Sequence, residues 1–120
     1  MRIVMSMSNL LQRDFLAGTL RNLGNSVTPK PCLADAKDYV QHCSQADVPD
    51  LVILQDDGHC NAFEIARAIE KNLIDTVAIV LVSSHGRADY PDVATVVNHG
   101  TAEQLAGRII TEYEKQFTPA

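Results

Sequence analysis

The chain has 120 residues, of which 46% are hydrophobic and 21% are charged, and its formal net charge is −5. This composition is typical of a globular chain and not of a disordered one, and an acidic chain without a Lys/Arg run lacks the basic face that nucleic-acid binding requires. No apolar segment is long enough to span a membrane and no signal-peptide core is present, so we expect neither nucleic acid nor membrane as a partner. Three cysteines at spacings that match no common motif fit reduced thiols in a cytoplasmic protein.

The N-terminal residues predict a strand followed by a helix. Residues 2–7 include a short apolar run typical of a strand, and Ser8 or Asn9 can cap the helix that follows. Apolar side chains then recur at helical spacing, at Leu11, Phe15, Leu16, Leu20 and Leu23. Gly24 supplies the stop. Gly18 within the helix costs about 1 kcal/mol relative to alanine, so we expect it to mark close packing.

The next segment predicts an edge strand and a second helix. Residues 25–31 contain Pro29 and Pro31, and because proline cannot donate to a hydrogen-bond ladder, this weak strand should lie at a sheet edge. The second helix is marked by Leu33, Ala36, Tyr39, Val40 and Cys43. We interpret Cys32 and Cys43 as packing residues.

The centre of the chain holds the stretch that organises the rest. Residues 51–54 are large and apolar without alternation, which indicates a strand covered on both faces, as in a parallel sheet. Asn61 and Glu64 form a start similar to a capping box. The apolar face of that helix is Phe63, Ala66, Ile69 and Leu73. Residues 76–82 predict a second buried strand. Because ligands of open α/β sheets bind beyond the carboxyl ends of the strands, we expect any chemistry at residues 55–60.

The C-terminal part predicts a strand at residues 93–97 and a last helix that begins at a capping box of Thr101 and Gln104. Only residues 84–92 connect the last two strands, whereas a parallel crossover usually needs roughly a dozen residues and a helix. The fourth helix should therefore be shortened or missing. The predicted fold class is α/β, a single doubly wound parallel sheet in one domain over residues 1–120.

With its elements in this order, the chain resembles the receiver domain of bacterial response regulators over nearly its whole length. The similarity is carried by Pro-Asp-Leu-Val-Ile-Leu at 49–54, Asn-Ala-Phe-Glu-Ile-Ala-Arg-Ala-Ile at 61–69 and Ile-Val-Leu-Val-Ser-Ser at 79–84. Receivers run Pro-Asp-Leu-Val-Leu-Leu-Asp and then Asp-Gly-Phe-Glu-Leu-Ala at matching places. The resemblance implies a flavodoxin-like sheet of five parallel strands in the order 2-1-3-4-5, which agrees with an edge position for residues 25–31.

Receivers accept a phosphoryl group on an aspartate at the end of the third strand, and the resemblance implies where their site residues fall here. The acceptor place falls on Gln55, an amide that cannot form an acyl phosphate. The acidic pair that helps to hold a divalent cation falls on Met7 and Ser8, which offer no carboxylate. The lysine place falls on Asn98, and only the hydroxyl place is kept, as Ser83.

Asp56 and Asp57 leave two further interpretations open. If the third strand ended one residue later, Asp56 would become the acceptor, although the cation would still lack its acidic pair. Alternatively, both aspartates belong to a solvated turn with Gly58, which Asx chemistry favours.

Histidine, cysteine and serine residues near the strand ends suggest competing sites. The histidines and the cysteine are His59, Cys60, His85 and His99. Together with Asp57 they could converge on Zn²⁺, although their spacing matches no recognised motif, and ordinary loop polarity is the alternative. Ser83 or Ser84 beside a histidine would suggest a hydrolase, but no Gly-x-Ser-x-Gly elbow is present. No glycine-rich phosphate loop follows the first strand, so no nucleotide cofactor is expected.

We therefore predict a degenerate receiver, or pseudo-receiver, that acts in two-component signal transduction by protein–protein interaction, without Asp phosphorylation, catalysis, metal or cofactor. Its partner would be a signalling protein or a second copy of itself, as a dimer. The expected interface is the face around residues 86–92 and the last helix, at Gly86, Tyr90 and Pro91, with Tyr90 either as an anchor or as a residue that packs the link onto the sheet. The competing hypotheses are a phosphorylatable receiver that uses Asp56 and a small metal-binding or enzymatic α/β protein.

Overall fold

The computed structural model describes residues 1–56, 62–72, 77–83 and 94–117. Within them, one sheet has the strand order β2-β1-β3-β4-β5, and every strand pair is parallel. The strands are β1 (Arg2–Ser6), β2 (Ser26–Lys30), β3 (Leu51–Asp56), β4 (Ala78–Ser83) and β5 (Ala94–Val97). The helices are α1 (Leu10–Asn22), α2 (Leu33–His42), the short 3-10 helix η1 (Gln45–Asp47), α3 (Ala62–Asn72) and α4 (Ala102–Phe117). The predicted doubly wound sheet and its order are confirmed.

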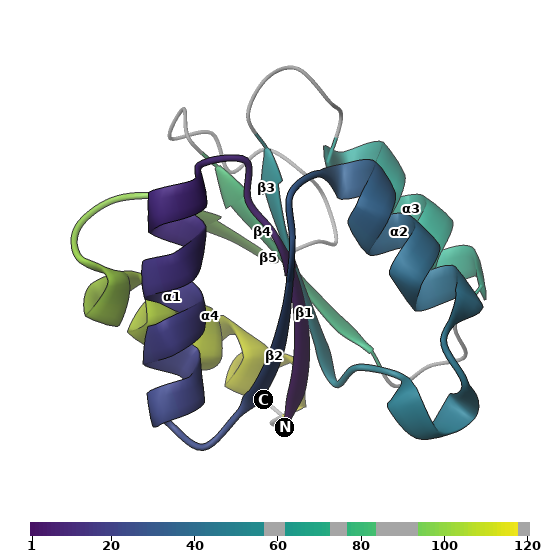
Figure 1. The fold of residues 1–120 in the computed structure, drawn as a ribbon, viewed down its shortest axis with the longest axis horizontal. Coiled ribbons are helices and arrows are strands. Elements are labelled where there is room, and N and C mark those ends of the chain that lie inside the picture. The colour runs from purple at the N-terminus through teal and green to yellow at the C-terminus, as the bar shows by residue number, and fades with distance from the viewer. Residues whose placement is uncertain (57–61, 73–76, 84–93, 118–120) are drawn as a thin grey trace.

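The sheet lies between two layers of helices, with α1 and α4 on one face and α2 and α3 on the other (Figure 1). Alternate residues of β3 supply both cores. Leu51 and Ile53 pack in the cluster beneath α1 and α4, whereas Val52 and Leu54 pack in the cluster beneath α2 and α3. All four side chains are fully buried. The uninterrupted apolar run therefore marks a strand covered on both faces, as predicted.

Local signals in the sequence set several element ends. β2 is an edge strand, as predicted from Pro29, which has no backbone N–H to donate to a neighbouring strand. The side chain of Asn9, not Ser8, caps α1 by accepting from the backbone N–H of Gln12 at 2.9 Å. Gly24 ends α1 with φ of 93°, a conformation that favours glycine.

The last helix begins with the predicted capping box. The N–H of Gln104 donates to the Thr101 hydroxyl oxygen at 3.2 Å, and the N–H of Thr101 donates to Gln104 Oε1 at 3.0 Å. Each bond satisfies a backbone donor that the first turn of a helix leaves without an intrahelical partner. These two bonds set where α4 begins, directly after Thr101.

Two packing expectations were wrong, those for Gly18 and Cys32; a Cβ added to Gly18 would meet no atom within 4 Å. Leu16 and Leu20 of α1 are buried, but Leu11, Phe15 and Leu23 are exposed. The helical spacing predicted the helix correctly without showing which of its apolar residues face the sheet. Cys32 is exposed at the N-cap of α2 and is not a packing residue.

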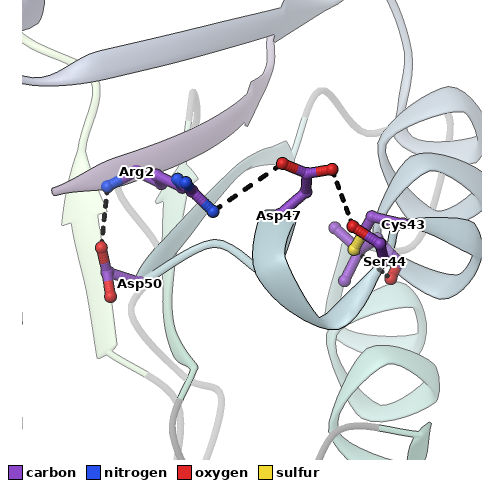
Figure 2. A network of polar contacts seen from close by, with 6 residues as sticks. Arg2, Cys43, Ser44, Asp47 and Asp50 are labelled. Atoms are coloured by element: carbon purple, nitrogen blue, oxygen red, sulfur yellow. Dashed lines mark hydrogen bonds and ion pairs between the residues drawn. The ribbon is translucent and has the colours of Figure 1, made fainter.

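The amino ends of the strands are joined by a polar network (Figure 2). The N–H of Arg2 donates to Asp50 Oδ2 at 2.7 Å, and the guanidinium of Arg2 lies 3.8 Å from the Asp47 carboxylate. Ser44 in turn donates its hydroxyl proton to Asp47 Oδ2 at 2.8 Å. Because the side chains of Arg2 and Asp47 are exposed, this ion pair contributes little to stability, at most about 1 kcal/mol. The network joins β1, η1 and the start of β3 at the edge opposite the strand ends where a receiver carries its chemistry.

Several predictions fall on segments outside the described residues. β4 ends at Ser83 and β5 begins at Ala94, so the connection comprises residues 84–93. The prediction of a shortened or missing fourth helix and the predicted interface residues Gly86, Tyr90 and Pro91 fall on it, and the predicted capping residue Asn61 also lies outside the described part. Among the described residues, no helix is long and apolar enough to cross a membrane.

Candidate functional site

The residues at the receiver-like positions meet at one edge of the sheet, where the parallel strands end. Ser8 follows β1, Gln55 and Asp56 end β3, Ser83 ends β4, and Asn98 follows β5. Asp56 is the register partner of Ser83, and the backbone N–H of Asn98 donates to the carbonyl oxygen of Ser83 at 2.8 Å. The fold therefore brings together the positions that the sequence alone could only align.

Gln55 occupies the acceptor position with a buried amide. Its side chain is on the same face of β3 as Ile53, and the residue is only 7% exposed. The backbone N–H of Ser8 donates to Gln55 Oε1 at 3.0 Å, and the Ser8 hydroxyl lies 3.4 Å from the same oxygen. The end of β3 is thus held to the β1–α1 loop by hydrogen bonds between neutral groups.

Asp56 is the last residue of β3, so the strand does extend one residue beyond Gln55. Successive strand residues point to opposite faces of a sheet, which places Asp56 on the side of Leu54, beside Ser83. The position that faces Ser8 therefore belongs to Gln55, and Asp56 lies on the other face of the strand. Asp56 is half-buried, and Ser83 is buried.

Met7 is fully buried in the core beneath α1 and α4, so an apolar side chain fills one place of the acidic pair. Its backbone is engaged on both sides. The N–H of Met7 donates to the carbonyl oxygen of Lys30 at 3.2 Å, and its carbonyl oxygen accepts from Arg13 Nη1 at 3.2 Å. Met7 therefore extends the pairing of β1 with β2 and offers no oxygen ligand from its side chain.

Asn98, at the lysine position, forms a reciprocal pair of hydrogen bonds with Gln12 of α1. Gln12 Nε2 donates to Asn98 Oδ1 at 2.6 Å, and Asn98 Nδ2 donates to Gln12 Oε1 at 3.2 Å. Both side chains are half-buried. This amide pair joins the first turn of α1 to the end of β5, two elements 86 residues apart in the chain.

No motif in the sequence marked Gln12 as a site residue. Its position, three residues after the capping Asn9, is the one at which a glutamine usually closes a capping box on its own helix. Here the Gln12 side chain reaches Asn98 instead. No local pattern distinguishes these two uses, because the second depends on where α4 and β5 pack.

The alternative metal and hydrolase sites are only partly described. Among residues 1–56, 62–72, 77–83 and 94–117, no group of three or more His, Cys, Asp or Glu residues could hold a metal ion. His99 is exposed, and its carbonyl oxygen accepts a hydrogen bond from Arg108. The other members of both sites lie outside the described residues: Asp57, His59, Cys60, Ser84 and His85.

No protein-family model and no curated protein matches the sequence, but solved structures match the fold over almost the whole chain. A response regulator receiver domain protein from Clostridium thermocellum has a TM-score of 0.73 at 18% identity, covering 97% of this chain and 96% of its own. The fold is that of receiver domains. A CheY-like receiver domain protein from Methanospirillum hungatei JF-1 has a TM-score of 0.76 at 13% identity, with coverages of 97% and 95%. An atypical orphan response regulator, whose structure is described as revealing a phosphorylation-independent regulatory mechanism, has a TM-score of 0.75 at 16% identity, with coverages of 95% and 96%.

Proposed function

We propose that residues 1–120 form one pseudo-receiver domain that acts in signal transduction by protein–protein interaction, without phosphorylation of an aspartate. The observation that carries the proposal is the buried amide of Gln55 at the acceptor position, hydrogen-bonded by Ser8. The receiver fold supports the wider assignment to signalling. The atypical orphan regulator of the same fold is a precedent for regulation that does not depend on phosphorylation.

The chemistry of phosphoryl transfer supports the proposal that no aspartate is phosphorylated at this edge of the sheet. Transfer to an aspartate requires a carboxylate nucleophile, a divalent cation and positive charge around the phosphoryl group. Gln55 supplies an amide, Met7 is buried and apolar, and Asn98 is a neutral amide bonded to Gln12. Mg²⁺ favours carboxylate oxygens at such a site, and neither residue of the acidic-pair position provides one.

Treatment with a small-molecule phosphodonor tests the proposal. The full chain is incubated with acetyl phosphate and Mg²⁺, and its intact mass is compared with that of a receiver that carries the acceptor aspartate. The expected result is an unchanged mass for this chain and one added phosphoryl group for the control receiver.

The Asp56→Asn variant separates the proposal from its nearest competitor. If the wild type gained a phosphoryl group that Asp56→Asn did not gain, the chain would be a phosphorylatable receiver and the proposal would be overturned. Asp50→Asn is the matched control, because Asp50 is an exposed aspartate just before the other end of the same strand.

A further inference from the structure

The outer surface of α1 carries most of the exposed large apolar side chains among the described residues. Leu11 is 66% exposed and Phe15 is 61% exposed, and Leu10 at the start of the helix and its C-cap residue Leu23 are exposed as well. Leu11 and Phe15 also line a groove of about 510 Å³ between α1 and the start of α4. We call this surface, from Leu10 to Leu23 with its groove, the α1 face.

A glycine in the α1 face is not explained by packing within the chain. Gly18 lies one turn after Phe15, and a Cβ added to it would meet no atom within 4 Å. Gly18 is also not among the glycines with positive φ. Its cost of about 1 kcal/mol relative to alanine is therefore offset neither by close packing nor by an unusual backbone conformation. A glycine on the outside of a helix allows another helix to approach closely.

The charges beside the apolar stripe favour a second copy of the same helix. Asp14 and Arg21 are both exposed and lie seven residues apart on one flank of α1, since seven residues are close to two full turns. When two copies of α1 cross in opposite directions at a point between Ala17 and Gly18, Asp14 of each copy faces Arg21 of the other. A two-fold interface of this kind needs one self-complementary patch, and the α1 face provides it in both charge and shape.

The same crossing places apolar groups opposite one another. Phe15 of one copy lies between Gly18 and Asn22 of the other, beside the space that the missing side chain of Gly18 leaves. Leu23, at the end of α1, lies opposite the start of the partner helix, beside the groove that Leu11 lines. Exposed apolar side chains that pack into such spaces are typical of the residues that dominate binding energy.

We propose that the α1 face is the interface of an antiparallel homodimer. The proposal rests on the proposed function in that it names the partner of a receiver that works by binding. The observations behind the dimer all concern α1, however, and not the acceptor position. Dimerisation and phosphorylation are therefore tested by separate measurements. The occupant is a second copy of this chain, held by Phe15 beside Gly18 and by the reciprocal pairs of Asp14 with Arg21.

Sedimentation equilibrium of the full chain, up to about 1 mM, tests the proposal. The wild type should form a dimer in a concentration-dependent manner, and Phe15→Glu should weaken the association by more than about tenfold. Gly18→Leu should do the same, because its side chain prevents close approach of the two helices. Gly107→Leu is the matched control, since Gly107 lies exposed on α4 with no atom near its added Cβ, and it should dimerise as the wild type does.

Charge-swapped variants identify the partner as a second copy. Asp14→Arg alone and Arg21→Asp alone should each be monomeric, because like charges then meet twice in the dimer. An equimolar mixture of the two should form a heterodimer in which both pairs have opposite signs. Circular dichroism shows whether each variant is folded. A wild type that stays monomeric, including one whose α1 face binds a different protein, would overturn the proposal, as would a mixture of folded variants that does not associate.

Discussion

The hydrogen-bonded pair of Gln12 and Asn98 allows a quantitative test of how the strand ends are held together. The pair contributes two hydrogen bonds, and a typical bond contributes about 0.5–1.5 kcal/mol net to stability. Two bonds therefore give a coupling of about 1–3 kcal/mol, and half-burial places it in the lower part of that range, because water can replace a lost partner. We expect a coupling free energy of about 1–2 kcal/mol between the two side chains.

A double-mutant cycle measures this coupling. The free energy of unfolding is determined by urea denaturation for the wild type, Gln12→Ala, Asn98→Ala and the double variant. Each single substitution leaves one amide without its partner, whereas the double substitution removes both, so the two single costs should sum to more than the double cost. The backbone bonds of Gln12 to Asn9 and of Asn98 to Ser83 remain in every variant. A coupling below about 0.3 kcal/mol would show that the pair does not hold α1 to β5.

Because the Gln12 and Asn98 side chains are both neutral, the dependence of their coupling free energy on salt and pH provides a second test. Salt at about 1 M shortens the screening length to about 3 Å and weakens exposed ion pairs. An amide has no titratable proton between about pH 5 and pH 9. The coupling should therefore stay constant over that pH range and at high salt. A coupling that falls strongly with salt would mean that charged groups, and not the amides, hold this edge.

Two further predictions concern the strand that organises the fold. Leu54→Ala should lower the free energy of unfolding by about 2–5 kcal/mol because Leu54 is fully buried. Leu11→Ala should lower it by less than about 0.5 kcal/mol because Leu11 is exposed. Equal losses of unfolding free energy in urea denaturation would contradict the assignment of the core. Gln55→Ala should cost about 1–3 kcal/mol because it leaves the N–H of Ser8 without this acceptor, and Ser8→Ala, which keeps that bond, should cost clearly less. Similar melting temperatures for Gln55→Ala and Ser8→Ala would show that the hydrogen bond from the Ser8 N–H to Gln55 does not stabilise the fold.

The receiver architecture was largely predictable because its signals are local or composition-based. The apolar run at residues 51–54 indicated a strand buried on both faces, and Pro29 indicated an edge strand; both predictions are confirmed. Gly24 and the Thr101–Gln104 capping box set helix ends through bonds within a few residues. Each of these signals depends only on residues close together in the chain, so it does not require the rest of the fold to be known.

The surface of α1 was not predictable from the same kind of pattern. Leu11 and Leu20 both belong to the apolar spacing, but they lie nine residues apart, which is two and a half turns and therefore opposite sides of the helix. Leu20 is buried and Leu11 is exposed. The apolar residues surround more of α1 than the sheet can cover. Which side is buried depends on how α1 sits against the sheet and α4.

By itself, the sequence determined the order of elements, the parallel sheet and the absence of an acceptor carboxylate at residue 55, because these follow from residue type and short-range spacing. Only the tertiary structure decided that Ser8 bonds Gln55, that Gln12 pairs with Asn98 and that Leu11 and Phe15 remain exposed. These contacts join residues far apart in the chain or depend on which face of a helix is covered. Their geometry is set by the packing of complete elements, which no local pattern encodes.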